Sequence, residues 1–283
     1  MQTLIYDQIT ASIIAELEKG AAPWVKPWKA DGTADRNLAS GNAYKGINRL
    51  ILGMQFKGSN TWATYKQWQD VGASVRKGEK GTHIVYFSPI TKHVKNSNGE
   101  DVESTYRLMK TYCVFNADQV DGYSAPVVDA PAIPFDSDAL CESRIIKTGA
   151  IVSHGGDAAF YAPSQDRIQL PNKTAFDTPA SYYSTAFHEL THWTGSKNRL
   201  DRIQTGSFGS KDYAFEELVA ELGAAFLCQE HGISGELRHA GYIQSWLKAL
   251  RDDNKLIFKA AAHAQKASDF ILSLDATTQS VAA

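Results

Sequence analysis

Apolar side chains recur at helical spacing at the start of this chain and again throughout its C-terminal half. Between residues 9 and 17 that spacing predicts a helix over 7–19, and Gly20 stands where a helix-ending glycine is expected. The residues that follow, up to about 46, are rich in proline, glycine and asparagine, which predicts an irregular loop.

The segment between residues 47 and 116 carries patterns typical of a mixed α and β fold. An apolar run over 47–54 and a short helical pattern near 64–71 come first. We then predict two strands, over 82–87 and 106–115, joined by the polar sequence KNSNGED as the loop of a hairpin.

Helical patterns dominate the C-terminal half. The sequence TPASYYSTAFHELTHWTG predicts a helix with Thr178 as N-cap, Pro179 in the first turn and Gly195 at the end. Ahead of it, short apolar pairs flank SQD and predict a hairpin in which 167–170 is a strand. An edge strand at that position could align an extended peptide by strand addition.

A second strong helix follows over DYAFEELVAELGAAFLCQEHG, with two more after it. Asp212 or Ser210 is expected to cap its start, and Gly232 to end it. Small residues leave one flank thin enough for another helix to approach closely. They are Ala220, Gly223 and Ala224.

The proline-rich sequence DQVDGYSAPVVDAPAIPFDS shows neither the helical spacing of apolar residues nor the alternation typical of a strand. It predicts an interdomain linker. We therefore expect an α+β protein with two domains, for which 283 residues suffice. The N-terminal α+β domain spans 1–125, the linker 126–136, and a mainly helical domain with a small β-sheet 137–283.

The first C-terminal helix carries the motif His188-Glu189-x-x-His192. Positions i and i+4 lie on one face of a helix, with Cβ atoms about 5–6 Å apart, so both imidazoles can bind one metal ion. Glu189 projects beside them, where its carboxylate can take a proton from a water that the metal polarises. This motif also arises by chance on solvated helices, but here the helix is well delimited and otherwise apolar. We expect Zn²⁺, with another divalent ion such as Mn²⁺ as the alternative.

A zinc site with two histidines needs a third protein ligand and an open position for water. The next helix supplies three carboxylates, at Glu216, Glu217 and Glu221. We favour Glu217 as the ligand and Glu221 as a partner that orients a ligating histidine. Glu216 and Glu221 remain alternatives for the ligand.

Cations and tryptophans are concentrated in the N-terminal region. Residues 19–95 hold thirteen lysines and arginines against four acids, a net charge of +9, although the whole chain has a net charge of −2. Single-stranded nucleic acid is held by aromatic rings that stack on bases and by cations that neutralise phosphates. Trp62 and Trp68 have the spacing of core residues on a helix. The residues expected to bind DNA are Trp24, Lys26, Trp28, Lys29, Tyr44, Lys45, Arg49, Lys66, Arg76, Lys77 and Lys80.

Composition argues against a membrane protein, a secreted protein and a thiolate metal site. A chain that is 43% hydrophobic and 21% charged can bury an ordinary globular core. No apolar run approaches the roughly 20 residues of a membrane span, and the N-terminus lacks the pattern of a secretory signal. The three cysteines form no CxxC pair, which argues against a thiolate metal site and fits a reducing compartment. We expect a cytoplasmic protein with no membrane partner.

Several segments, in order along nearly the whole chain, resemble the antirestriction proteins of the ArdC type and the related plasmid TraC proteins. In the N-terminal region these are KGAAPWVKPW, NLASGNAYKGIN and WATYKQWQDVGASVRKGEKG. In the C-terminal region they are YYSTAFHELTHWTGSKNRLDR and YAFEELVAELGAAFL. The C-terminal segments resemble the zincin-like metallopeptidase domain of that family, which is similar to SprT-like proteases.

The resemblance implies a single-stranded-DNA-binding domain joined to a zinc metallopeptidase-like domain. It implies a bacterial, plasmid-type protein that protects incoming DNA from host restriction during conjugation, made in or transferred to the recipient cell. It also implies His188 and His192 as ligands, Glu189 as catalytic acid and base, and a glutamate of EELVAE as third ligand. DNA-bound proteins or restriction enzymes are then candidate substrates. The alternative is a non-catalytic single-strand-binding protein whose metal is structural. A nuclease is disfavoured because a His/His/Glu site lacks the carboxylate-rich metal pair of such enzymes.

Overall fold

A computed structural model describes most of the chain. The described residues are 2–19, 34–95, 101–124, 137–204, 206, 210–233 and 243–274. The predicted linker over 126–136 lies outside them, as do four of the expected DNA-binding residues, Trp24, Lys26, Trp28 and Lys29.

The N-terminal half combines short helices with a four-stranded sheet in the order β1-β2-β5-β4 and a two-stranded sheet, β3-β6. Strand β1 runs parallel to β2, whereas β2, β5 and β4 pair antiparallel. The elements are α1 (Gln2–Glu18), β1 (Arg36–Asn37), α2 (Ile47–Gly53), β2 (Thr61–Thr64), α3 (Tyr65–Asp70), β3 (Ser74–Val75), β4 (Thr82–Lys95), β5 (Asp101–Asn116), the 3₁₀ turn η1 (Ala117–Gln119) and β6 (Val120–Asp121).

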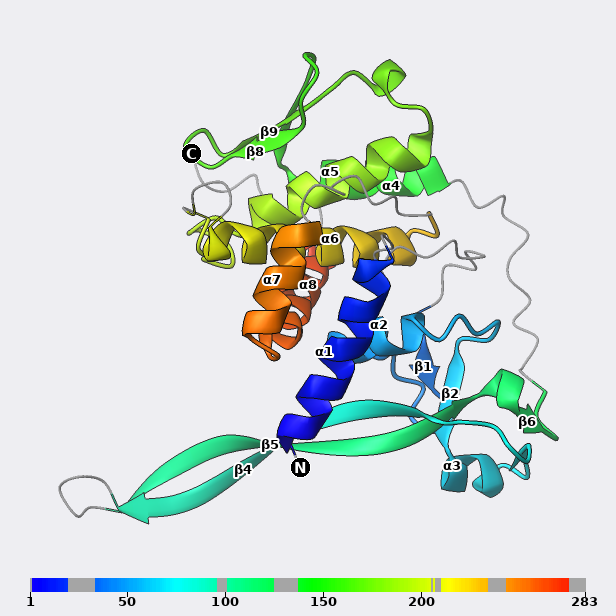
Figure 1. The fold of residues 1–283 in the computed structure, drawn as a ribbon. Coiled ribbons are helices and arrows are strands. Elements are labelled where there is room, and N and C mark those ends of the chain that lie inside the picture. The colour runs from blue at the N-terminus through cyan, green and yellow to red at the C-terminus, as the bar shows by residue number, and fades with distance from the viewer. Residues whose placement is uncertain are drawn as a thin grey trace.

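Three of these elements are longer than the sequence predicted. Helix α1 begins at Gln2 rather than at residue 7, because Ile5 and Tyr6 also pack on the core, with the Tyr6 ring 4.5 Å from that of Phe258. Strands β4 and β5 continue as a ribbon along one end of the molecule (Figure 1). Pro89 is tolerated within β4 because this strand forms the edge of its sheet.

The C-terminal half is mainly helical with one small sheet, as predicted. Its elements are α4 (Ser137–Thr148), β7 (Ile151–His154), β8 (Phe160–Ala162), β9 (Arg167–Leu170), the 3₁₀ turn η2 (Lys173–Ala175), α5 (Pro179–Thr194), α6 (Lys211–Glu230), α7 (Ile243–Asp252) and α8 (Leu256–Ser273). The α+β fold class is confirmed. No helix within the described ranges has both the length and the hydrophobicity needed to cross a bilayer.

The small sheet corrects one expectation. The predicted strand over 167–170 exists as β9, but it lies in the middle of the order β7-β9-β8, parallel to β7 and antiparallel to β8. Its backbone is therefore paired on both sides and cannot add a peptide strand. The two edges of this sheet belong to β7 and β8.

One apolar core joins the two halves of the chain. Ile13 and Leu17 of α1 and Leu50 of α2 lie in the same buried cluster as Leu218 of α6 and Trp246 of α7. Helix α6 is packed between α5 and α8 (Figure 1). The helix that carries the three candidate glutamates is thereby held on several sides by buried apolar contacts.

Gly223 sets how closely α5 and α6 approach. A Cβ added there would lie 2.5 Å from Cγ2 and 2.6 Å from Oγ1 of Thr191, a buried side chain of α5. The thin flank predicted for α6 is therefore the surface on which α5 packs.

We expect Gly223→Ala to lower the free energy of unfolding by about 1–3 kcal/mol, because overpacking forces the two helices apart. Urea denaturation of the purified protein measures this loss. Adding Thr191→Ala removes both clashing atoms and should recover part of the stability. Equal stability of Gly223→Ala and the parent would show that the close approach is unimportant.

Candidate metal centre

Local sequence positions both helices of the site. Oγ1 of Thr178 accepts a hydrogen bond from the backbone N–H of Ser181 at 3.1 Å, and Pro179 occupies the first turn of α5, as predicted. Helix α6 is capped by Ser210, whose Oγ accepts from the N–H of Tyr213, rather than by Asp212. Gly232 adopts a φ of 65° just after α6, as a helix-ending glycine is expected to do.

Gly195 follows α5 for a different reason than expected. Its φ is −75°, so no left-handed conformation requires glycine there. A Cβ would instead lie 2.6 Å from Nε2 of Gln204 and 2.9 Å from Nη2 of Arg202. The missing side chain makes room for the loop after α5 to fold back beneath the site.

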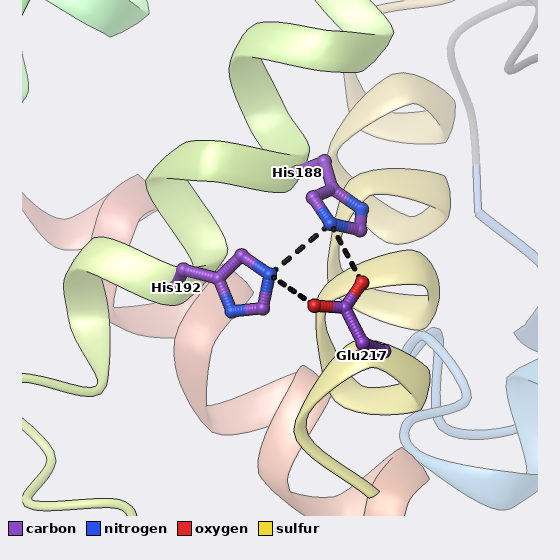
Figure 2. Close-up of side chains that lie close together, drawn as sticks. All are labelled: His188, His192 and Glu217. Atoms are coloured by element: carbon purple, nitrogen blue, oxygen red, sulfur yellow. Dashed lines mark hydrogen bonds and ion pairs between the residues drawn. The ribbon is translucent and has the colours of Figure 1, made fainter. Parts of the chain in front are cut away.

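His188, His192 and Glu217 point toward a common centre (Figure 2). The two Nε2 atoms are 3.1 Å apart. One oxygen of Glu217 lies 3.6 Å from Nε2 of His188 and the other 3.5 Å from Nε2 of His192. One potential ligand atom from each residue lies within 4.8 Å of the others, so these three side chains could hold a single metal ion.

The other two glutamates face the outer sides of the imidazoles. Nδ1 of His188 lies 3.4 Å from Oε1 of Glu221, and Nδ1 of His192 lies 3.1 Å from Oε1 of Glu216. A carboxylate opposite Nδ1 favours the tautomer that carries its proton there and leaves the Nε2 lone pair for a metal. The pairing between Glu221 and a histidine was expected. That of Glu216 with the second histidine was not.

Arg202 fixes Glu216 in position through hydrogen bonds. Its side chain is 3% exposed, and its guanidinium donates to both carboxylate oxygens of Glu216 at 3.0 and 2.8 Å. It also donates to the backbone oxygen of Thr191 and to Oγ1 of Thr194. Gln204 adds a bond to the backbone oxygen of His192 at 2.6 Å.

Sequence reasoning missed both Arg202 and Gln204. They come from a polar loop, and its length and composition do not reveal that it returns to the site. The available signal was the glycine at 195, which permits that close return.

The carboxylates outweigh burial in setting the protonation of the cluster. Burial lowers the pKa of His192, but hydrogen bonds to Glu216 and Glu217 raise it by more, to about 9. The pKa of His188 is likewise raised, by Glu217 and Glu221. Burial alone would raise the pKa of Glu216, but His192 and Arg202 lower it by a larger amount, so that the pKa is about 2. A metal bound here must therefore displace protons, and its affinity falls as the pH is lowered.

A cavity of about 310 Å³ opens onto the cluster. Glu189 lines it beside His188 and His192, although the Glu189 side chain is not one of the three convergent groups. The cavity lining also includes Phe160 and Tyr161 of strand β8. The cavity thus places a carboxylate and the edge strand of the small sheet next to the metal-binding groups.

The tyrosine of that lining is held by a polar contact network. The Tyr161 hydroxyl donates to Oδ1 of Asp166 at 2.9 Å and accepts from Nη2 of Arg199 at 3.3 Å. Arg199 also pairs with Asp166 and lies over the Trp193 ring. Tyr161 is therefore fixed in place at the cavity.

The expected DNA-binding residues differ in accessibility. Arg49 is buried, and it pairs with Glu230 at 3.0 Å and donates to the backbone oxygen of Phe226 at 2.9 Å. Arg49 joins α2 to the end of α6. Its burial corrects the expectation that it contacts DNA. Trp62 and Trp68 are buried core residues, as anticipated. The expected cations that are exposed are Lys45, Lys66, Arg76, Lys77 and Lys80, and Tyr44 is half-buried.

Two different protein-family models match the N-terminal and the C-terminal half of the chain. Residues 3–115 match the family model described as the N-terminal domain of anti-restriction factor ArdC. Residues 139–263 match a zincin-like metallopeptidase model. The chain is 40% identical over 289 residues to DNA primase TraC of Escherichia coli, covering 95% of this chain but only 27% of TraC. It is 39% identical to the uncharacterised protein y4eC of Sinorhizobium fredii, covering 95% and 92% of the two chains.

Two solved structures of the antirestriction protein ArdC from plasmid R388 are also similar. The metal-free structure has a TM-score of 0.77 at 40% identity and covers 94% of this chain and 96% of that one. The Mn(II)-bound structure has a TM-score of 0.78 at 38% identity and covers 97% and 99%.

Proposed function

Since this chain belongs to the ArdC antirestriction family, we propose that it binds single-stranded DNA and holds a divalent metal ion at a metallopeptidase-like site, protecting incoming plasmid DNA from restriction. The convergence of His188, His192 and Glu217, which line a cavity, carries the second part of this proposal. The basic, aromatic N-terminal half supports the first.

The residues present fit a divalent ion. His188, His192 and Glu217 would hold it through two imidazole nitrogens and a carboxylate, a donor set that suits Zn²⁺ and leaves a position open. Mn(II) in a crystal structure of plasmid R388 ArdC makes Mn²⁺ the alternative. When bound, such an ion supplies Lewis acidity and lowers the pKa of a water.

Glu189 is the proposed general base and acid. Its carboxylate lines the cavity beside the histidines, where it takes a proton from the attacking water and returns it to the leaving amine. Glu216 and Glu221 hold the two imidazoles from behind, and neither of them lies between the two Nε2 atoms as Glu217 does. The three glutamates of α6 are thereby divided into one ligand and two orienting groups.

Strand β8 is the proposed place for an extended substrate. It is an edge of its sheet and lines the cavity, so a peptide can add to it through backbone hydrogen bonds. Phe160, which is 49% exposed, offers an apolar contact to a substrate side chain. DNA-bound proteins, including restriction enzymes, are the proposed substrates.

A purely structural metal is the second candidate. The cluster joins α5 to α6, and Arg202 ties the following loop to both, so a metal could serve to fasten them. In that case the protein acts by covering single strands, and Glu189 has no chemical task.

Metal binding is tested directly by chelation. Removing the ion with a chelator should lower the thermal midpoint, because a ligand at 100 times its Kd stabilises the native state by about 2.7 kcal/mol. Elemental analysis before and after treatment identifies the ion. His192→Ala should lack the metal and show no further loss with chelator. A midpoint unaffected by chelator in metal-loaded protein would contradict the site.

A further inference from the structure

We propose that the path of single-stranded DNA continues from the N-terminal half onto helix α8, along two adjoining grooves that meet at Lys45. This inference rests on the proposed single-strand binding and assigns it a location. It adds Lys255 and Lys259 of the C-terminal half, which the sequence did not connect with DNA. It also assigns base stacking to two exposed tyrosines, Tyr86 and Tyr112, which the sequence did not connect with DNA.

The first groove lies over the sheet and has a volume of about 850 Å³. Tyr86 and Tyr112 line it and are 54% and 44% exposed. They are diagonal neighbours on one face of the β4–β5 ribbon, with ring centroids 6.4 Å apart at an interplanar angle of 71°. Unpaired bases stack on exposed aromatic rings of this kind.

Amide side chains complete the wall of this groove. Asn37, Asn42 and Gln67 face it, together with the half-buried ring of Tyr44. Asn37 donates to the Tyr44 hydroxyl at 3.1 Å, which fixes that ring. Amides can donate to and accept from the edges of unpaired bases, edges that a duplex keeps in its own pairs.

The second groove has a volume of about 580 Å³ and lies between α1, α2, β4 and α8. Its walls carry the apolar rings of Phe87 and Phe258, and its cations are Lys45, Lys255 and Lys259. No acidic residue is among the described residues that line it. Three cations without an opposing acid in the wall favour an anionic occupant.

The grooves share Lys45, Asn48 and Val85, so they adjoin at the edge of β4. Asn48 is fixed there by two bonds to the backbone of Val85, at 2.7 and 2.9 Å. A strand lying in both grooves would meet stacking rings first and cations next. This alternation fits a flexible single strand better than a stiff duplex.

The ion pairs at these lysines do not block phosphate binding. Lys45 contacts Asp269 and Lys259 contacts Asp253, with all four side chains between 38% and 63% exposed. Exposed pairs contribute little stability, so a phosphate can replace the carboxylate at low cost. The Lys255 ammonium lies 5.4 Å from the centre of the Tyr6 ring, and Asp253, which pairs with Lys259, also attracts it.

The basic turn that carries Lys77 and Lys80 is the competing location. Both lysines are exposed, but neither lines the two grooves. The neighbouring Arg76 pairs with Glu79 and Asp121, which reduces the positive charge of the turn. The turn also lacks an exposed aromatic pair.

The test is titration of the full-length protein against a fluorescent 20-mer of deoxythymidine at several salt concentrations. Tyr86→Ala with Tyr112→Ala should weaken binding about 5- to 150-fold for each base that loses its ring. Lys255→Ala with Lys259→Ala should weaken it and reduce the salt slope by about 1.4, since each single-strand phosphate contact contributes about 0.7. Charge-matched controls are Lys197→Ala with Lys248→Ala, which lie outside both grooves, whereas Lys77→Ala with Lys80→Ala tests the competing basic turn. Thermal melting verifies that all variants are folded.

The outcomes distinguish failure of the proposed single-strand binding from failure of its proposed location. If the parent protein does not bind the oligomer, the proposed single-strand binding itself fails. If the parent binds and both groove variants bind like the controls, only the location is wrong. A loss confined to the Lys77 and Lys80 pair would assign the basic turn instead. Tighter binding of a 20-mer RNA or of duplex DNA would overturn the choice of single-stranded DNA.

Discussion

Glu189→Gln should reduce peptide-bond hydrolysis by about 10²–10⁴-fold while leaving the fold and the metal content unchanged. Glutamine has nearly the same shape, but its amide cannot accept a proton from water. Glu189 is 5% exposed and lines the cavity, yet it is not among the three groups that converge on the centre. Its loss should therefore affect turnover and spare metal binding.

The measurement uses fluorescently labelled casein, an unfolded protein probe, with and without a single-stranded oligonucleotide. Elemental analysis and thermal melting of the same samples report metal and fold. The control is His192→Gln, which should lose metal as well as hydrolysis. In cells, a Glu189→Gln protein that protects conjugating DNA as well as the parent does would reject proteolysis as the biological role and favour the structural metal.

Arg202→Met should lower the free energy of unfolding by about 3–5 kcal/mol, the cost of removing one partner of a buried ion pair. Glu216 would keep its negative charge in a site where it is only 5% exposed. We also expect metal affinity to fall about 10–100-fold, because Glu216 would no longer be held against Nδ1 of His192.

Denaturant titration of metal-free protein and competition with a chelator measure the two effects separately. The double variant Arg202→Met with Glu216→Met removes both charges and should recover much of the stability but not the metal affinity. Arg202→Lys keeps the charge but not the two parallel bonds, and it should lie between the parent and the methionine variant. Unchanged metal affinity in Arg202→Met would show that Arg202 stabilises the fold but does not position Glu216 for metal binding.

The same pair predicts a dependence on pH. Since the pKa of Glu216 falls from 4.5 to about 2 on folding, its stabilisation is fully present above about pH 4.5. It is lost progressively as the pH falls toward 2. Acid titration of the parent should show this loss, and the double variant should show less of it.

Local patterns determined where α5 begins and how the residues of the central motif are spaced. Thr178 and Pro179 start α5, and the spacing of His188 and His192 places both imidazoles on one face, because a helix repeats every 3.6 residues whatever surrounds it. The small residues of α6 likewise indicated a close helix contact, which Thr191 makes with Gly223. These features depend on neighbours within a few residues, so the sequence alone was sufficient.

Contacts between distant segments were decided only by the tertiary structure. Glu216, Glu217 and Glu221 are chemically alike, and which one faces both histidines depends on the rotation of α6 against α5. The burial of Arg49 depends on α2 meeting the end of α6, some 180 residues along the chain. Strand β9 became central because β7 and β8 pair on its two sides, which no pattern within β9 reveals. The sequence by itself determined which groups could bind a metal, because helical periodicity is local. The tertiary structure decided which of those groups face one another, because packing sets which atoms meet.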